Sequence, residues 1–444
     1  MATLDKLATG YEDKLLACIH CGLCLEACPT YVITGNENDG PRGRLYLMRA
    51  VAEGRLENTS NAFATHIDRC LGCRACEQVC PAGVEYGQLL EASREVLLEA
   101  QPKSDLANRL LRFVLRHVWL SPWRLRMFFR ASRVFRDLGL ARLLLKIGLP
   151  RRVQFGMALL ESSKDVSPAK AQRRKESRKG ARRSVALFKG CVGEGLFARV
   201  NRATERVLEA NNFNVEIPNQ VCCGALHAHA GDLEGARELA RRNIAAFDSD
   251  APIVTNAGGC GAMLKTYAHL LPNDERAANF SARVRDVSQQ LTDMRTAPSP
   301  VDQSVTYDTS CHLMYGQGSG EASERMLRSV TGKDFVALNG SERCCGAAGV
   351  YNLLQPEMSQ RVLNEKLDHI KDTGAGILAT GNPGCQMHIG AGARLSGMKL
   401  RVCHPIEIVD QAYESAGYYD PQPENAKDLR AGPDTSRHRG VRNT

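Results

Sequence analysis

The sequence predicts a multidomain protein of the α+β and α/β classes: a helical domain organised by cysteines, a basic helical connector, and two similar α/β units. Eight of the 17 cysteines fall in two compact runs within residues 1–100. Strand-like and helix-like segments alternate twice over between about residues 184 and 412. A length of 444 residues also exceeds what one hydrophobic core usually covers, so several domains are expected.

Composition divides the chain into six expected segments. They are a cysteine domain at 1–100, a basic amphipathic helical connector at 101–160, a flexible basic linker at 161–183, a first repeat at 184–300, a second repeat at 301–420 and a disordered tail at 421–444. The linker and the tail are assigned because their residues are mostly polar or charged, which leaves little to bury.

The cysteine content indicates metal binding or redox chemistry rather than disulfides. The count of 17 is odd, and the start MATLDKLATGYEDK lacks the apolar core of a secretory signal. Both observations favour a reducing cytoplasm, where clustered cysteines seldom form disulfides. The sequence has no uninterrupted run of 18 or more apolar residues, so we expect no transmembrane helix.

The two runs of the first segment, CIHCGLCLEACP and CLGCRACEQVCP, share the spacing C-x2-C-x2-C-x3-C-P. This is the spacing of bacterial ferredoxins that hold two [4Fe-4S] clusters. Three cysteines of a run wrap one cube, whereas the fourth points to the other cube, so the expected ligand sets are crossed. The first set is Cys18, Cys21, Cys24 and Cys80, and the second set is Cys28, Cys70, Cys73 and Cys76.

A structural zinc site is the alternative for this segment, because C-x2-C pairs also suit tetrahedral zinc. Two complete four-cysteine runs of identical spacing weigh strongly against zinc. No catalytic side chain accompanies the runs, so we interpret the segment as a ferredoxin-like helical domain that relays electrons. Arg42 and Arg44 in the PRGR segment fit two roles equally well: they brace the cluster loop or acidic groups, or they lie in a solvated loop.

The positive charge of the chain is confined to its middle. Between Lys103 and Arg183, 22 Lys and Arg stand against 5 Asp and Glu, a balance of +17, so the net charge of +9 leaves the remainder near −8. No nucleic-acid module accompanies this charge, and we expect no nucleic-acid partner. Arginines recur at helical intervals around Trp119, Trp123 and Phe128. Such helices suit an anionic membrane surface or another subunit equally well.

An internal repeat occupies the C-terminal half. In each copy a strand leads to a cysteine, a Cys-Cys-Gly triplet follows, and a second strand leads to a fourth cysteine. Strands that alternate with helices predict parallel sheets, which carry their sites at the carboxyl ends of the strands. The two sets are Cys191, Cys222, Cys223 and Cys260, and Cys311, Cys344, Cys345 and Cys385.

These motifs resemble a known family. The Cys-Cys-Gly repeat is similar to the cysteine-rich domain of heterodisulfide reductases, of the C subunit of anaerobic glycerol-3-phosphate dehydrogenase and of lactate-utilisation proteins. The likeness is greatest to the iron-sulfur subunits of glycolate oxidase (glycolate dehydrogenase), and extends from Cys18 to Ala412 apart from the basic middle. It is carried by the cysteine runs and by GNENDGPRGRLYLMRAVAEG, GGCGAM, CCGAAGVYNL, NPGCQMH and HPIEIVDQA.

The resemblance implies an electron-transfer subunit of a membrane-associated, flavin-dependent glycolate dehydrogenase. Separate FAD-binding subunits would oxidise glycolate to glyoxylate, and this chain would pass the electrons toward a quinone-type acceptor. The implied location is the cytoplasm, with peripheral attachment to the inner face of the cytoplasmic membrane. The sequence contains no G-x-G-x-x-G after a strand, so FAD is expected only on partner subunits, and the chain is expected to be inactive alone.

One departure separates the chain from the heterodisulfide reductase type, in which each repeat ends in C-x2-C and supplies five cysteines to a non-cubane cluster. Met263 and His388 occupy the closing positions here. Each repeat therefore offers four cysteines, with His388 as a further candidate ligand and Met263 as core filler. A third iron-sulfur cluster, zinc or a purely structural site stays open for the repeats. Cys403 is expected to be a buried core thiol.

Three classes of function compete. The first is an electron-transfer subunit of a flavin-linked dehydrogenase, with lactate or glycerol-3-phosphate as alternatives to glycolate. The second is a catalytic subunit like that of heterodisulfide reductase, which the loss of the fifth cysteine disfavours. The third is a zinc scaffold, which the ferredoxin-type runs disfavour. We expect no catalytic side chain in this chain, and the sequence does not determine the substrate of the complex.

Overall fold

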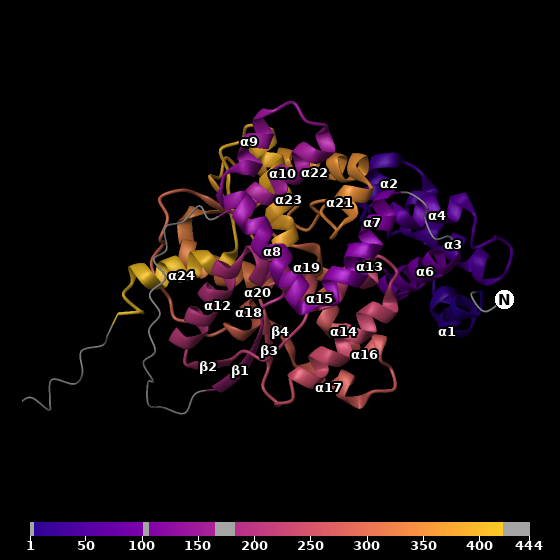
Figure 1. Cartoon of the computed structure of the whole chain (residues 1–444), viewed down its shortest axis with the longest axis horizontal. Coiled ribbons are helices and arrows are strands. Elements are labelled where there is room, and N and C mark those ends of the chain that lie inside the picture. The colour runs from indigo at the N-terminus through magenta and orange to yellow at the C-terminus, as the bar shows by residue number, and fades with distance from the viewer. Residues whose placement is uncertain (1–3, 101–105, 165–182, 421–444) are drawn as a thin grey trace, which may run out of the picture.

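The computed structural model describes residues 4–100, 106–164 and 183–420. The expected tail (421–444) and most of the expected linker (165–182) lie outside these residues. Figure 1 shows the first helices gathered at one end of the molecule, two α/β units in its centre, and α24 (Pro405–Ser415) at the opposite end.

The N-terminal domain is helical, as the sequence predicts. Its longer helices pack around Met48, Val51, Phe63 and Leu89, which are fully buried. Two cysteine loops connect short helices: Cys28 is the N-cap of α2, and Pro29 supplies the fixed φ of the first helical position. The elements are α1 (Leu4–Leu16), α2 (Pro29–Thr34), the 3-10 turn η1 (Glu37–Asp39), α3 (Pro41–Ala52), α4 (Asn61–Asp68), α5 (Ala75–Gln78) and α6 (Tyr86–Ala100).

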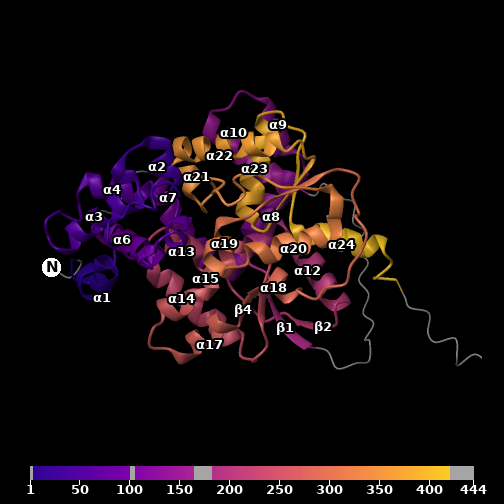
Figure 2. The same ribbon diagram turned by 180° about the vertical axis from the view of Figure 1, so that it is seen from behind.

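The connector is also helical. Its elements are α7 (Leu106–Val114), the π-helical turn η2 (Leu115–Trp119), α8 (Pro122–Asp137), α9 (Leu140–Lys146) and α10 (Arg151–Ser162). Pro122 begins α8, and Gly139 takes a left-handed conformation before α9. Helix α10 packs along α23 (Pro383–Leu395) of the second repeat. Both views show α9, α10, α22 (Pro356–Asp372) and α23 together on one side of the molecule (Figures 1 and 2).

The first repeat is a four-stranded parallel sheet of order β2-β1-β3-β4 with helices around it. Its central strand β1 ends in four consecutive buried residues, as expected of a strand covered on both faces. The elements are β1 (Arg183–Phe188), α11 (Cys191–Leu196), α12 (Ala198–Ala210), β2 (Phe213–Glu216), α13 (Ala225–His229), α14 (Leu233–Ala246), β3 (Ile253–Thr255), α15 (Gly258–Lys265), α16 (Tyr267–Leu270), α17 (Glu275–Arg283), β4 (Val284–Asp286) and α18 (Val287–Gln290).

The second repeat has the same topology, with the parallel order β6-β5-β7-β8. The prediction of two parallel α/β units is thus confirmed. The elements are β5 (Val305–Asp308), α19 (Cys311–Gln317), α20 (Gly320–Thr331), the 3-10 turn η3 (Gly332–Asp334), β6 (Phe335–Val336), α21 (Tyr351–Leu354), α22 (Pro356–Asp372), β7 (Ile377–Thr380), α23 (Pro383–Leu395), β8 (Arg401–Cys403) and α24.

The two repeats share one hydrophobic core. Buried residues of β1 and β3 belong to the same cluster as those of β5, β7 and α24, among them Leu187, Val254, Tyr307 and Val409. Helix α15 packs against α19, and α24 packs against both α12 and α20. The repeats therefore form a single interlocked unit, because one face of each sheet lies in this shared core.

Candidate metal centres

Two cavities in the N-terminal domain are lined by its cysteines. Cys18, Cys21, Cys24 and Cys80 line one cavity, which we call the outer site because Cys21 is exposed. Cys28, Cys70, Cys73 and Cys76 line the other, which we call the inner site because Cys28, Cys70 and Cys76 are buried. Cys28 thus lies with the second run, and Cys80 lies with the first.

The start of α3 separates the two sites. Pro41, Cys76 and Tyr86 line both cavities. Arg42 borders only the outer site, and Arg44, two residues further along the helix, borders only the inner site. Of the two roles left open by the sequence, the structure shows bracing contacts for both arginines.

Arg42 holds the outer loop from the surface. Its guanidinium forms two hydrogen bonds with the Glu37 carboxylate, of 2.7 and 3.1 Å, and donates a third to the main-chain oxygen of His20 at 3.1 Å. The hydrogen bond from Arg42 is the leading cause that lowers the pKa of Glu37. The side chain of Arg42 is 31% exposed, so water screens its charge.

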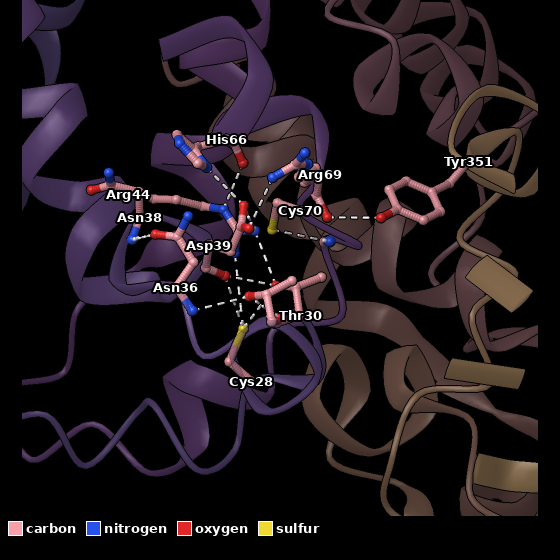
Figure 3. Close-up of polar contacts among 12 residues, drawn as sticks. Cys28, Thr30, Asn36, Asn38, Asp39, Arg44, His66, Arg69, Cys70 and Tyr351 are labelled. Atoms are coloured by element: carbon pink, nitrogen blue, oxygen red, sulfur yellow. Dashed lines mark hydrogen bonds and ion pairs between the residues drawn. The ribbon is translucent and has the colours of Figure 1, made fainter. Parts of the chain in front are cut away.

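Arg44 lies beneath the inner site and is 1% exposed (Figure 3). It donates hydrogen bonds to the main-chain oxygen of His66 (2.7 Å) and to the hydroxyl of Thr30 (3.0 Å), and its Nη1 lies 3.9 Å from Cys28 Sγ. Burial alone would lower the pKa of Arg44, but nearby negative groups, led by Cys70, raise the pKa above its ordinary value.

The thiols of the inner site also meet two hydroxyl groups. Thr30 Oγ1 lies 3.2 Å from Cys28 Sγ, and the hydroxyl of Tyr86 lies 3.6 Å from Cys70 Sγ. Burial is the main cause that raises the pKa of Cys73 and Cys76. Without a positively charged group between them, these thiols therefore stay protonated. Iron in the cavity would supply that charge, so the donor set and its surroundings fit an iron-sulfur cluster.

The cysteines of the first repeat lie together at the carboxyl ends of β1 and β3. Cys191 Sγ and Cys222 Sγ are 3.4 Å apart. A Cβ atom on Gly190 would lie 3.2 Å from Cys260 Sγ, so the chain passes close to that thiol. The hydrogen bond with Cys222, followed by burial, raises the pKa of Cys191 well above its usual value.

The cysteines of the second repeat form a matching group beyond β5 and β7. Cys311 Sγ and Cys344 Sγ are 4.0 Å apart, and Asn382 donates to Cys385 Sγ at 3.3 Å. Gly346 has φ +88°, and a Cβ atom there would lie 2.7 Å from the main-chain oxygen of Ser359, so only glycine fits the triplet. Its amide donates to Cys344 Sγ at 3.4 Å.

His388 lies behind the Cys-Cys-Gly loop of the second repeat. Its Nε2 is 3.2 Å from the Ser359 hydroxyl and its Nδ1 is 3.3 Å from the Asn352 side chain. Burial lowers the pKa of His388 to about 4. Both ring nitrogens thus have partners other than cysteine. Met263 and Cys403 are buried in hydrophobic clusters, as expected of core residues.

The inner site lies against the cysteines of the second repeat. Leu71 and Cys73 pack in one cluster with Cys311 and Cys344. The Tyr351 hydroxyl of α21 donates to the main-chain oxygen of Arg69 at 2.8 Å (Figure 3). The inner site therefore lies between the outer site and the cysteines of the second repeat.

Within residues 4–100, 106–164 and 183–420, no three or more His, Cys, Asp or Glu side chains converge on a single-ion site. The thiols of the N-terminal domain border cavities instead. In the same ranges, no helix is both long and apolar enough to cross a bilayer.

The sequence did not single out several of the residues around the inner site. Thr30, Asp39, His66, Tyr86 and Tyr351 carry its polar contacts. Asp39 lies within the GNENDGPRGR segment and Tyr351 within CCGAAGVYNL. Both segments carry the family resemblance, but neither indicates that these two residues reach the inner site. Their roles depend on contacts between residues far apart in the sequence.

Comparison with known proteins agrees with this arrangement. A family model described as a 4Fe-4S dicluster domain matches residues 14–84, and one described as a cysteine-rich domain matches residues 185–265 and 305–390. The chain is 37% identical over 427 residues to the probable glycolate oxidase iron-sulfur subunit of Bacillus subtilis, with 92% of this chain and 95% of the relative covered. The glycolate oxidase iron-sulfur subunit of Escherichia coli is 34% identical over 417 residues, which cover 91% and 95%. Lactate utilization protein A of Oceanobacillus iheyensis is 34% identical over 234 residues, which cover 51% of this chain and 96% of the relative.

Proposed function

The chain belongs to the family of glycolate oxidase iron-sulfur subunits, and from this premise we propose that it relays electrons from an FAD-binding partner toward a quinone-type acceptor. Its substrate-oxidising partner would convert glycolate to glyoxylate. The outer and inner sites each hold one [4Fe-4S] cluster in this proposal, with the crossed cysteine sets as ligands.

One observation carries the proposal: the two cysteine-lined cavities share a wall, and the inner one touches the cysteines of the second repeat. Bound there, [4Fe-4S] clusters would each accept and release one electron. Cys21 places the outer site at the surface, where a partner can reach it. The buried inner thiols exclude water from the next site. The arrangement is that of a relay through the protein.

The second repeat is our candidate for a further iron-sulfur site. Cys311 and Cys344, two of its four cysteines, pack in one cluster with Cys73 of the inner site, whereas the cysteines of the first repeat form a separate group. Position in the relay therefore favours redox chemistry in the second repeat. A structural role fits the first repeat, since Cys222 and Cys223 pack in its hydrophobic cluster.

Oxidation of the 2-hydroxy acid belongs to the partner in this proposal. The sequence has no dinucleotide fingerprint, and Asp39, His66 and His388 near the cysteines are held in structural contacts. Lactate and glycerol-3-phosphate are the alternative substrates of the complex, and catalysis like that of heterodisulfide reductase is the alternative activity.

We place the chain at the inner face of the cytoplasmic membrane through its connector. Residues 106–164 carry 13 Lys and Arg against 2 Asp and Glu. Trp123 and Phe128 on α8 are 60% and 46% exposed. Basic helices with exposed aromatic side chains suit the headgroup region of an anionic bilayer.

The experiment is anaerobic purification of the native complex through a tag on this chain. The expected result is a co-purified flavoprotein, and bleaching of the iron-sulfur absorbance on addition of glycolate. D-lactate and glycerol-3-phosphate serve as competing reductants. The purified chain without its partner is the control and is expected to show no bleaching with any of them. Bleaching of the flavin-free chain by glycolate would contradict the proposal.

A further inference from the structure

The outer and inner sites differ in the polar groups that reach their thiols. At the inner site, Arg44, Thr30 and Tyr86 place a guanidinium and two hydroxyl groups within 3.9 Å of Cys28 or Cys70. At the outer site, Arg42 is the neighbouring cation, and its guanidinium donates hydrogen bonds to Glu37 and to the main-chain oxygen of His20. The two arginines of one motif therefore act on different sites.

The buried carboxylate beside Arg44 has closer partners than Arg44. Asp39 is fully buried, and its carboxylate lies 2.7 Å from His66 Nδ1 and 3.1 Å from Arg69 Nη1. Arg44 Nη2 is farther from that carboxylate, at 3.9 Å. The closer ion pair of Asp39 thus belongs to Arg69, whose side chain is 38% exposed. Figure 3 draws Arg44 among its partners Thr30, Cys28 and Asp39.

Burial decides how strongly the charge of each arginine affects the neighbouring site. Arg44 is 1% exposed, whereas Arg42 is 31% exposed and paired with Glu37. A charge removed from water acts far more strongly on its neighbours than one that water screens. Reduction of a cluster adds one negative charge, and hydrogen bonds to sulfur and nearby positive charge favour the reduced form. Arg44 therefore favours reduction at the inner site more than Arg42 does at the outer site.

We propose that Arg44, assisted by Thr30 and Tyr86, holds the reduction potential of the inner site above that of the outer site. This inference rests on the proposed function, in which both sites hold a [4Fe-4S] cluster. An electron delivered at the exposed outer site then moves downhill to the inner site, beside the second repeat. One electron leaves the outer site for each electron that the inner site gains. Arg44 touches the inner thiol and is a positioning residue of the relay, and it takes no part in substrate chemistry.

The test is an anaerobic redox titration of the full-length, cluster-loaded chain, followed by EPR. The compared proteins are the wild type, Arg44→Gln, Arg44→Lys and Arg42→Gln. Cys28→Ser and Cys80→Ser assign the two signals, because each removes one ligand of one site. Iron content is measured for every variant.

We expect Arg44→Gln to shift the reduction equilibrium of the inner site at least tenfold toward the oxidised form, which is about 59 mV for a one-electron couple. The outer site keeps its potential. Arg44→Lys preserves the charge, so the inner site should keep most of its wild-type reduction potential. Arg42→Gln should leave the reduction potential of the inner site unchanged. If Arg44→Gln fails to assemble, Tyr86→Phe removes only the hydroxyl near Cys70 and lowers the same potential by a smaller amount.

Equal shifts at both sites, no shift at the inner site, or a wild type in which the outer site has the higher potential would each overturn the inference. These outcomes leave the clusters, and hence the proposed function, intact. A wild-type chain without cluster signals would instead overturn the proposed function and this inference together.

Discussion

The hydroxyl of Tyr351 donates a 2.8 Å hydrogen bond to the main-chain oxygen of Arg69, the residue before Cys70. Tyr351 begins α21, shortly after the Cys-Cys-Gly loop of the second repeat, and is 6% exposed. The bond joins the inner site to the second repeat, although 282 residues separate the two partners.

Removal of that hydroxyl should loosen the junction. Tyr351→Phe leaves the Arg69 oxygen without its partner, so we expect a loss of about 1 kcal/mol of stability. Hydrogen exchange of the amides in residues 69–73 should become faster. Tyr315→Phe is the matched control, because its hydroxyl bonds to the Glu342 oxygen inside the second repeat. Faster exchange at 69–73 in the control but not in Tyr351→Phe would argue against this connection.

The crossed ligand sets predict different effects of two similar variants. Cys28 ends the first run but lines the inner site, and Cys80 ends the second run but lines the outer site. Cys28→Ser should therefore perturb the inner-site signal in EPR, and Cys80→Ser the outer-site signal. Metal binding and folding are coupled in a domain of this size, so both variants are also expected to lose some stability. Loss of the signal of the cysteine's own run in each variant would refute the crossing.

Iron content tests the second repeat. With a third [4Fe-4S] cluster bound there, the anaerobic chain should contain about twelve iron atoms rather than about eight. Cys345→Ser should return the content to about eight, whereas Cys223→Ser in the first repeat should leave it unchanged. Iron analysis of the three proteins decides the matter, and a wild-type content of eight would make the second repeat structural.

Membrane attachment should depend on the exposed aromatic residues of α8. Trp123→Ala combined with Phe128→Ala should reduce co-flotation with vesicles that contain phosphatidylserine. High salt should have a similar effect, because it screens the arginines around them. Leu395→Ala, which removes an exposed apolar side chain outside the connector, is the control. Flotation that is insensitive both to salt and to the double variant would assign α8 to a subunit contact.

Asp286 predicts a pH dependence of stability. Burial raises the pKa of Asp286 to about 6, and its carboxylate caps α18 through Ser288. Because the folded pKa lies above the unfolded value, the carboxyl stabilises the fold below about pH 4, and this contribution is lost as pH rises through 6. Asp286→Asn keeps a hydrogen-bond acceptor for Ser288. At pH 8 its free energy of unfolding should exceed that of the wild type by up to about 3 kcal/mol. Thermal unfolding at pH 5 and pH 8 measures the gain, which should shrink at the lower pH.

The local features of this protein could be predicted from the order of its amino acids. The cysteine spacing identified two four-cysteine runs, since a loop around a cluster needs ligands at fixed intervals. Strand and helix alternation predicted the parallel sheets, and placed Cys191, Cys260, Cys311 and Cys385 at strand ends, where the structure has them. Both signals are short in range and therefore visible in sequence.

How these parts contact one another could not be predicted in the same way. The sequence treated Arg42 and Arg44 alike, yet α3 turns one toward solvent and buries the other under Cys28. The contact of the inner site with Cys311 and Cys344 of the second repeat depends on residues hundreds of positions apart. Such contacts follow from the packing of whole domains, and no local spacing or periodicity encodes them.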